Sequence, residues 1–162
     1  MRFPTLLLSL FFALSAAFGA SAQDITKGDL VISAPWSRAT PAGAQVAGGY
    51  VVITNKGLSA DRLVSFTTDL ADQPEVHEMT NEGGVMKMRP LAKGLVIPAG
   101  ATVKLEPGGY HLMLLKLKKP LVAGQRYRAV LVFEKAGAVE AEFEVRAMGA
   151  GQQKSHGGHH NH

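Results

Sequence analysis

Apolar and polar residues alternate along two stretches near the C-terminal end of the chain, residues 127–133 and 139–145. A period of two predicts β-strands with one face in the core and the other in water. The inward rows are Tyr127, Ala129, Leu131 and Phe133, and then Val139, Ala141, Phe143 and Val145. The link at 135–137 is short enough to join the two strands as an antiparallel hairpin.

Shorter apolar runs precede this hairpin, and turn residues separate them at regular intervals. The expected strands are 30–33, 49–54, 63–67, 75–80, 85–89, 103–106 and 110–117, and the expected turns are 55–57, 81–84, 98–100 and 107–109. There is no long helical period and no internal repeat. The pattern predicts an all-β sandwich or barrel, with one domain over residues 23–148.

Both ends of the chain fall outside this pattern. Arg2 precedes an apolar run at 6–18, and small residues at 20–22 form a signal-peptidase site. We therefore expect residues 1–22 to be a secretion signal that is cleaved before Gln23, with no stable membrane insertion afterwards. A retained anchor is the alternative, although the run is short for a bilayer.

Composition narrows the classes of function. The formal charge of +4 is too mild to indicate nucleic-acid binding, and the densest basic cluster, residues 116–119, has no aromatic residues among its lysines. The chain has no cysteine, which excludes disulfides, thiolate metal sites and cysteine nucleophiles. It also lacks a Gly-x-Ser-x-Gly elbow, a P-loop and a dinucleotide fingerprint, so we expect no enzyme.

Methionine and histidine cluster in one part of the chain. Four of the six methionines, Met79, Met86, Met88 and Met113, lie between residues 77 and 113. His77 and His111 bracket that stretch and are the only histidines before the C-terminal tail. A single core methionine or histidine is usually a packing residue, but the clustering favours a shared site.

The expected hairpin at 75–89 brings part of this cluster together. A four-residue loop at 81–84 would place Met79 opposite Met86 and His77 opposite Met88 on one face. The same register would pair Glu78 with Lys87 on the other face. A loop of odd length would break this arrangement.

His111 and Met113 are two residues apart and therefore project from the same face of their strand. Leu112 and Leu114 point into the core, whereas the alternation slips after Met113. A bulge or the end of the buried sheet would explain this slip, and bulges often lie beside functional sites.

Two imidazoles and two thioethers form a neutral, soft ligand set. Such a set favours copper(I) over zinc, calcium or iron. Without a thiolate, the site should bind copper more weakly than a cysteine site and can donate the ion to one. Because the histidines must be neutral to bind, we expect the affinity to fall below about pH 6.5.

These segments resemble the periplasmic copper chaperones of the PCu(A)C family. The resemblance covers most of residues 29–147 and is carried by 34–41, 77–79, 84–89, 108–114 and 121–137. It implies a cupredoxin-like Greek-key fold, with His77, Met88, His111 and Met113 as the copper ligands. Met79 and Met86 are not ligands in the family pattern, which leaves them as packing or supporting residues around the site.

The resemblance also implies a biological context. Members deliver copper to cytochrome c oxidase in the periplasm, so the expected partners are the copper-bearing oxidase subunit and Sco-type proteins. We expect a monomer. Two other classes stay open: a periplasmic copper buffer or resistance protein without a dedicated acceptor, and a β-sandwich adhesion module in which these residues only pack.

The flexible tail expected at 149–162 is rich in histidine. Its histidines are His156, His159, His160 and His162. A cloning tag is the alternative, but glycine and asparagine interrupt the run. Imidazole-only sites suit copper(II), so we expect the tail to be an accessory site that captures the oxidised ion.

Overall fold

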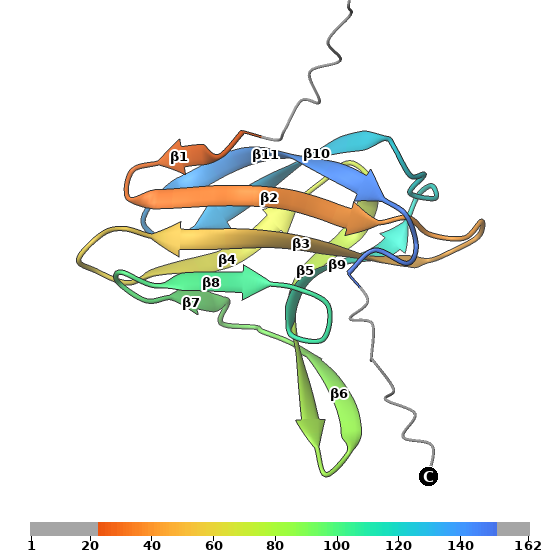
Figure 1. The fold of residues 1–162 in the computed structure, drawn as a ribbon, viewed down its shortest axis with the longest axis horizontal. Helices are drawn as coiled ribbons and strands as arrows, with labels where there is room; N and C mark the ends of the chain where they lie inside the picture. The colour runs from red at the N-terminus through yellow and green to blue at the C-terminus, as the bar shows by residue number, and fades with distance from the viewer. Residues whose placement is uncertain (1–22, 152–162) are drawn as a thin grey trace, which may run out of the picture.

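The computed structural model describes residues 23–151, and in that range the chain is all-β, with no helix. Its eleven strands are shown in Figure 1. They are β1 (Ile25–Lys27), β2 (Leu30–Arg38), β3 (Val46–Asn55), β4 (Asp61–Thr67), β5 (Ala71–Glu82), β6 (Val85–Pro90), β7 (Leu95–Ile97), β8 (Thr102–Leu105), β9 (Tyr110–Leu117), β10 (Arg126–Phe133) and β11 (Gly137–Arg146). The expected all-β class is confirmed.

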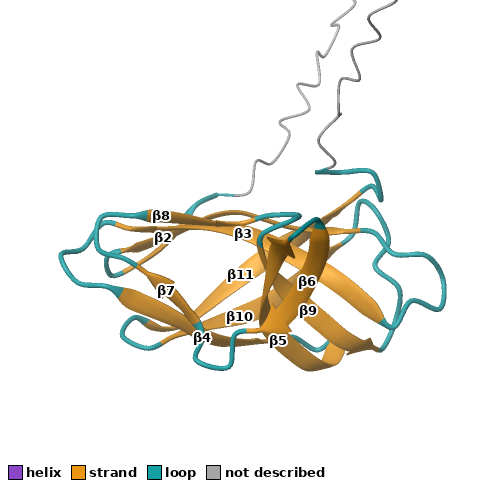
Figure 2. Ribbon diagram, turned by 90° about the horizontal axis from the view of Figure 1, so that it is seen from below, coloured by secondary structure: helices purple, strands orange, loops and turns teal. Residues whose placement is uncertain are grey.

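The strands form one continuous sheet that curls back on itself. Their order is β6-β5-β9-β8-β3-β2-β11-β10-β4-β7, with β1 added on β2 and a further pairing between β9 and β3. Among the strands of residues 23–151, only the β2–β11 and β8–β9 pairs are parallel. Figure 2 shows β2, β3 and β8 facing β4, β5 and β7 across the interior. This is the sandwich-like arrangement that the sequence predicts.

The core follows the alternation of the sequence. In β11, the apolar row from Val139 to Val145 is buried, whereas the glutamates between those residues are exposed or half-buried. β10 pairs with β11 as the expected hairpin, with Phe133 opposite Gly137. Phe143 and Phe66 are among the largest fully buried side chains. Each phenylalanine contributes about 1.5–3 kcal/mol to folding through burial of its ring.

Three features of the strands differ from the expectation. The three-residue strands β1 and β7 were not predicted, because three residues are too few to establish a period. β2 continues to Arg38 through a bulge between Ser33 and Trp36. Ala34 lies in this bulge with a φ of 48°, which lets the strand resume pairing beyond it.

The predicted register of the β5–β6 hairpin is wrong by two residues, and His77 lies opposite Pro90 instead of Met88. The turn contains only Gly83 and Gly84, and Met79 lies opposite Met88 rather than Met86. Both glycines have positive φ, 64° and 86°, which fits a two-residue type I′ turn. The expected Glu78–Lys87 pair is not formed, because Glu78 pairs with Arg89 and Lys87 pairs with Glu82. A shift of two residues keeps every side chain on its predicted face.

The slip in β9 lies further along than Met113. Leu112 and Leu114 are buried as expected, and Leu117 is also buried although its number is odd. Lys116 between them has a φ of 54°, which rotates the strand and changes the buried phase. The part of β9 that carries His111 and Met113 is therefore regular strand.

The predicted secretion signal at 1–22 lies outside the described residues. Within residues 23–151, no helix is long and apolar enough to cross a membrane.

Candidate metal centre

The two histidines of the folded domain face each other across neighbouring strands. β5 and β9 are antiparallel, and their register places His77 directly opposite His111. The ring centroids are 5.7 Å apart. Both residues are buried, at 7% and 6% exposure. Buried polar side chains need partners, so their surroundings indicate what they are arranged to bind.

One ring nitrogen of His111 is fixed by the backbone. Its Nδ1–H donates to the carbonyl oxygen of Gly109 at 3.0 Å, which leaves the Nε2 lone pair free in the neutral ring. Nε2 faces the sulfur of Met88 at 3.1 Å. Two electron-pair donors that face each other are an arrangement that a soft cation between them would stabilise.

His77 is fixed by an acidic neighbour. Its Nε2 lies 2.7 Å from the carboxylate of Glu75, which accepts the ring proton. The Nδ1 lone pair is then buried and has no partner in the described structure. A carboxylate that orients a histidine in this way is the usual outer partner of a metal-binding imidazole. The sequence reasoning missed Glu75, although its position two residues before His77 put it on the same strand face.

The remaining donors gather around a hollow of about 280 Å³. Met79, Met88, His111 and Met113 lie on its wall. Met79, which the sequence leaves as a supporting residue, lies beside the three predicted ligands. Met86 does not line the hollow and is 52% exposed at the outer part of the hairpin.

β2 and β3 also contribute to the wall, through Arg38, Gly48 and Tyr50. Gly48 lies opposite Met113, and a Cβ at this glycine would come within 2.7 Å of the Tyr50 hydroxyl. The missing side chain therefore gives the Tyr50 ring room beside the methionine. Tyr50 also packs on Trp36, with ring centroids 4.5 Å apart.

The electrostatics of the hollow favour neutral donors. Burial lowers the pKa of His111 below its ordinary value, which outweighs the raising effect of the Gly109 carbonyl, and His77 adds a further lowering. The imidazole therefore remains neutral and able to bind a cation through the neutral pH range. Burial also raises the pKa of Tyr50, partly offset by Arg38.

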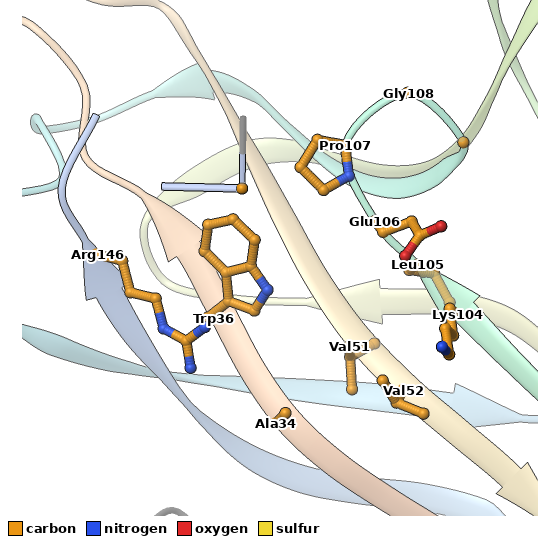
Figure 3. A pocket seen from close by; sticks show the side chains of 12 residues that line it. Ala34, Trp36, Val51, Val52, Lys104, Leu105, Glu106, Pro107, Gly108 and Arg146 are labelled. Atoms are coloured by element: carbon orange, nitrogen blue, oxygen red, sulfur yellow. The ribbon is translucent and has the colours of Figure 1, made fainter. Parts of the chain in front are cut away.

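A second hollow has a volume of about 620 Å³ (Figure 3). Gly109 and Trp36 lie on its wall, and Arg146 stacks on the Trp36 ring at 5.1 Å. Gly151 lies on the same wall, and a Cβ at this position would come within 2.8 Å of the Trp36 ring. The first residues of the predicted tail therefore lie against the domain, and Ala150 accepts hydrogen bonds from Arg38, which lines the first hollow. The four tail histidines lie outside the described residues.

The donor set is distinctive in its chemistry. In residues 23–151, no group of three or more histidine, cysteine, aspartate or glutamate side chains is placed to hold a metal ion. Only the thioethers complete a coordination set around the two imidazoles. The residues present therefore fit a soft cation such as copper(I) and not a cation that needs several hard oxygen ligands.

The family model described as "Putative lipoprotein LpqE-like" matches residues 30–145. The chain belongs to the LpqE-like family. It is 37% identical over 102 residues to "Putative lipoprotein Lxx21020" of Leifsonia xyli, covering 63% of this chain and 60% of that protein. It is 27% identical over 103 residues to "Uncharacterized protein RP573" of Rickettsia prowazekii, covering 62% and 57%. The chain thus spans about three fifths of the length of these relatives.

Solved copper-binding domains share this fold. The copper-bound PCuAC domain from PmoF2 has a TM-score of 0.66 and 26% identity, covering 77% of this chain and 98% of that domain. The apo PCuAC domain from PmoF1 has the same TM-score and 29% identity, covering 77% and 99%. Copper(I)-bound DR1885 from Deinococcus radiodurans has a TM-score of 0.57 and 28% identity, covering 80% and 83%. The cupredoxin-like PCuAC fold is therefore confirmed.

Proposed function

We propose that this chain is a copper chaperone that binds copper(I) as cargo between His77, Met88, His111 and Met113. The observation that carries the proposal is the unpaired Nδ1 of His77 together with the Nε2 of His111, which faces the Met88 sulfur at 3.1 Å. The likeness to copper-bound PCuAC domains supports the same cargo. No step of bond-breaking catalysis is needed, so the role is transport and not enzymatic.

We further propose that the protein works after export, in the periplasm. The relative from Leifsonia xyli and the family model are both named as lipoproteins, which supports an exported chain. The test is N-terminal sequencing of the exported protein. A start at Gln23 is expected, whereas a chain that begins at Met1 would contradict cleavage.

The proposed acceptor is the copper-bearing subunit of cytochrome c oxidase, with Sco-type proteins as neighbours in the same pathway. A site without thiolate can pass copper(I) to a thiolate acceptor down a gradient of affinity. The alternative is a buffer that stores copper without a specific acceptor.

Copper(I) affinity tests the site. Competition with a chromophoric chelator under reducing conditions should give one tight ion, and Met113→Leu, which conserves volume, should weaken it. His111→Ala should weaken it by more than the roughly 10- to 100-fold that loss of an outer partner costs. Met148→Leu is the control, because Met148 is exposed and lies outside the cluster. Unchanged affinity in both site variants would refute the proposed ligands.

Transfer separates delivery from buffering. The copper(I)-loaded protein is mixed with an apo oxidase copper domain, or with a generic chelator of matched affinity. A chaperone should load the oxidase domain faster than the chelator. Equal rates would favour the buffer.

A further inference from the structure

The β5–β6 hairpin carries a row of thioethers that extends outward from the hollow. Met79 and Met88 lie directly opposite each other, and Met86 follows two residues further along β6. Opposed side chains in such a pair have Cβ atoms about 5 Å apart, and residues two apart on one strand are about 7 Å apart. The three sulfurs therefore lie on one face, within reach of a single soft cation or of successive positions for it.

The two faces of this hairpin differ in chemistry. The opposite face carries charged side chains in ion pairs, Glu78 with Arg89 at 2.9 Å and Glu82 with Lys87 at 2.5 Å. The thioether face of the hairpin has no charged pair and carries His77, Asn81 and Pro90 beside the methionines. The charged face of the hairpin is therefore occupied by ion pairs, whereas the opposite face presents neutral soft donors.

Exposure increases outward along the row. Met88 is 47% exposed and still contacts His111 in the hollow, whereas Met86 is 52% exposed and does not line the hollow. Figure 1 shows that this hairpin projects away from the body of the sandwich. An exposed methionine gains little from packing, so burial does not explain Met86.

We propose that Met86, together with Met79 and Met88, forms an outer position through which copper(I) passes on its way into and out of the hollow. This inference rests on the proposed copper site. Each step forms one copper–sulfur bond and breaks one bond to an inner ligand or to the exchanging partner. Copper stays in the +1 state throughout, and no proton moves, because thioethers carry none.

Such a role has a kinetic consequence that a structural role lacks. A ligand used only on the path changes the barrier and not the end states, so uptake and release must slow by the same factor. A ligand of the resting site would instead weaken the affinity, mainly by speeding release. The two rates together therefore distinguish the two roles.

The test is anaerobic stopped-flow exchange of copper(I) between the full-length protein and bicinchoninate, followed in both directions by the colour of the chelate. Met86→Leu conserves volume and removes the sulfur. We expect both exchange rates to fall by about 3-fold or more, with the affinity unchanged within about 2-fold. Met148→Leu, at an exposed methionine outside the hairpin, should match wild type in both measurements.

Two outcomes would overturn the outer position: wild-type exchange rates in Met86→Leu, or a loss of affinity with only the release rate changed. These outcomes are separate from a failure of the proposed function. That failure would appear as weak copper(I) binding by the wild-type protein, or as unchanged affinity in His111→Ala and Met113→Leu. The role of Met86 is judged by comparing the uptake and release rates of Met86→Leu with those of the wild-type protein.

Discussion

The carboxylate of Glu75 determines which nitrogen of His77 is available. It accepts the Nε2 proton at 2.7 Å and leaves Nδ1 as the electron-pair donor inside the protein. The Gly109 carbonyl does the same for the opposite nitrogen of His111. The two imidazoles are therefore oriented before any ion arrives, which lowers the cost of binding.

Removal of the Glu75 carboxylate should weaken copper(I) binding without removing a ligand. We expect Glu75→Ala to lose about 10-fold or more in affinity, the usual cost of an outer-shell partner. Glu75→Gln keeps an acceptor and should lose less. Chelator competition measures the affinity, and nitrogen-15 NMR of the His77 ring reports the loss of the Nε2–H tautomer.

The matched control for Glu75 is Asp72→Asn on the same strand, whose carboxylate pairs with Lys118 at the surface. It should bind copper(I) like wild type. Wild-type affinity in Glu75→Ala would contradict a positioning role for Glu75.

At the residue scale, the sequence predicted the types of the ligand residues better than the orientation of their side chains. The clustering of histidine and methionine indicated a shared site, and the family resemblance selected His77, Met88, His111 and Met113 from it. The structure brings the last three to one hollow, with His77 facing His111. The roles of Glu75 and Gly109 were not predicted. These roles depend on the rotation of the imidazole rings and on which strands are neighbours in the sheet. The spacing of residues along the chain determines neither.

At the element scale, the β5–β6 turn keeps Met88 in place. Gly84 has a φ of 86°, a conformation that a β-branched residue adopts at a cost of about 1–2 kcal/mol. We expect Gly84→Val to loosen the hairpin and to lower copper(I) affinity by up to about 10-fold, because Met88 is then held less firmly against His111.

The neighbouring glycine supplies the control for this prediction. Gly83→Asn should have little effect, since asparagine tolerates the φ of 64° found there. Chelator competition on both variants measures the difference. Equal affinities for the two variants would show that the turn does not support the site.

The hairpin also shows why register is harder to predict than pairing. Alternation placed the faces correctly, because a slip of two residues preserves them. The charge match of Glu78 with Lys87 was a weak guide, since Arg89 satisfies Glu78 equally well and Lys87 pairs with Glu82. Exposed ion pairs contribute little energy and cannot fix a register. The positive φ of the two glycines fixes it instead.

Asp61 joins the start of β4 to the turn between β10 and β11. Its carboxylate accepts from the backbone N–H groups of Arg62, Lys135 and Ala136, at 2.7, 2.9 and 3.0 Å. Burial alone would raise the pKa of Asp61, but these hydrogen bonds and the charge of Lys135 together lower it. The stabilisation is therefore complete above the unfolded pKa of about 3.9 and is lost as the pH falls through the lower folded value.

We expect Asp61→Asn to lower the free energy of unfolding by about 1–3 kcal/mol at pH 7, because the amide nitrogen cannot accept a backbone N–H. The difference from wild type should shrink as the pH falls below about 4. Urea unfolding at several pH values measures it, with the exposed Asp69→Asn as control. A difference that is constant with pH would contradict a contribution from the ionised carboxylate.

At the scale of the whole molecule, the site depends on contacts between distant parts of the chain. His77 and His111 are 34 residues apart in sequence and meet only because β5 and β9 are adjacent in the sheet. Local patterns predicted most of the strands but not this adjacency, since alternation does not say which strand lies beside which. The resemblance to a known family supplied the fold that periodicity alone left open between sandwich and barrel.

The C-terminal segment connects the domain to the histidine-rich tail close to the hollow. The guanidinium of Arg38, which lines the hollow, donates to the carbonyl oxygen of Ala150 at 2.7 and 3.0 Å. The first tail histidine, His156, follows Gly151 by five residues, a length of chain that spans at most about 17 Å. We predict that the tail captures copper(II) near this hollow, and an external one-electron reductant must convert the ion to copper(I) before the methionine site can take it.

Deletion of residues 152–162 tests this role and keeps the contact between Arg38 and Ala150. We expect copper(II) uptake by the truncated protein to fall sharply, because imidazole-only sites suit the oxidised ion, while copper(I) affinity stays at the wild-type value. His111→Ala should instead lower the copper(I) affinity and leave copper(II) uptake by the tail close to the wild-type value. Equilibrium dialysis with copper(II) and chelator competition with copper(I) measure the two. Unchanged copper(II) uptake after the deletion would contradict capture by the tail, since the described domain supplies only two imidazoles for that ion.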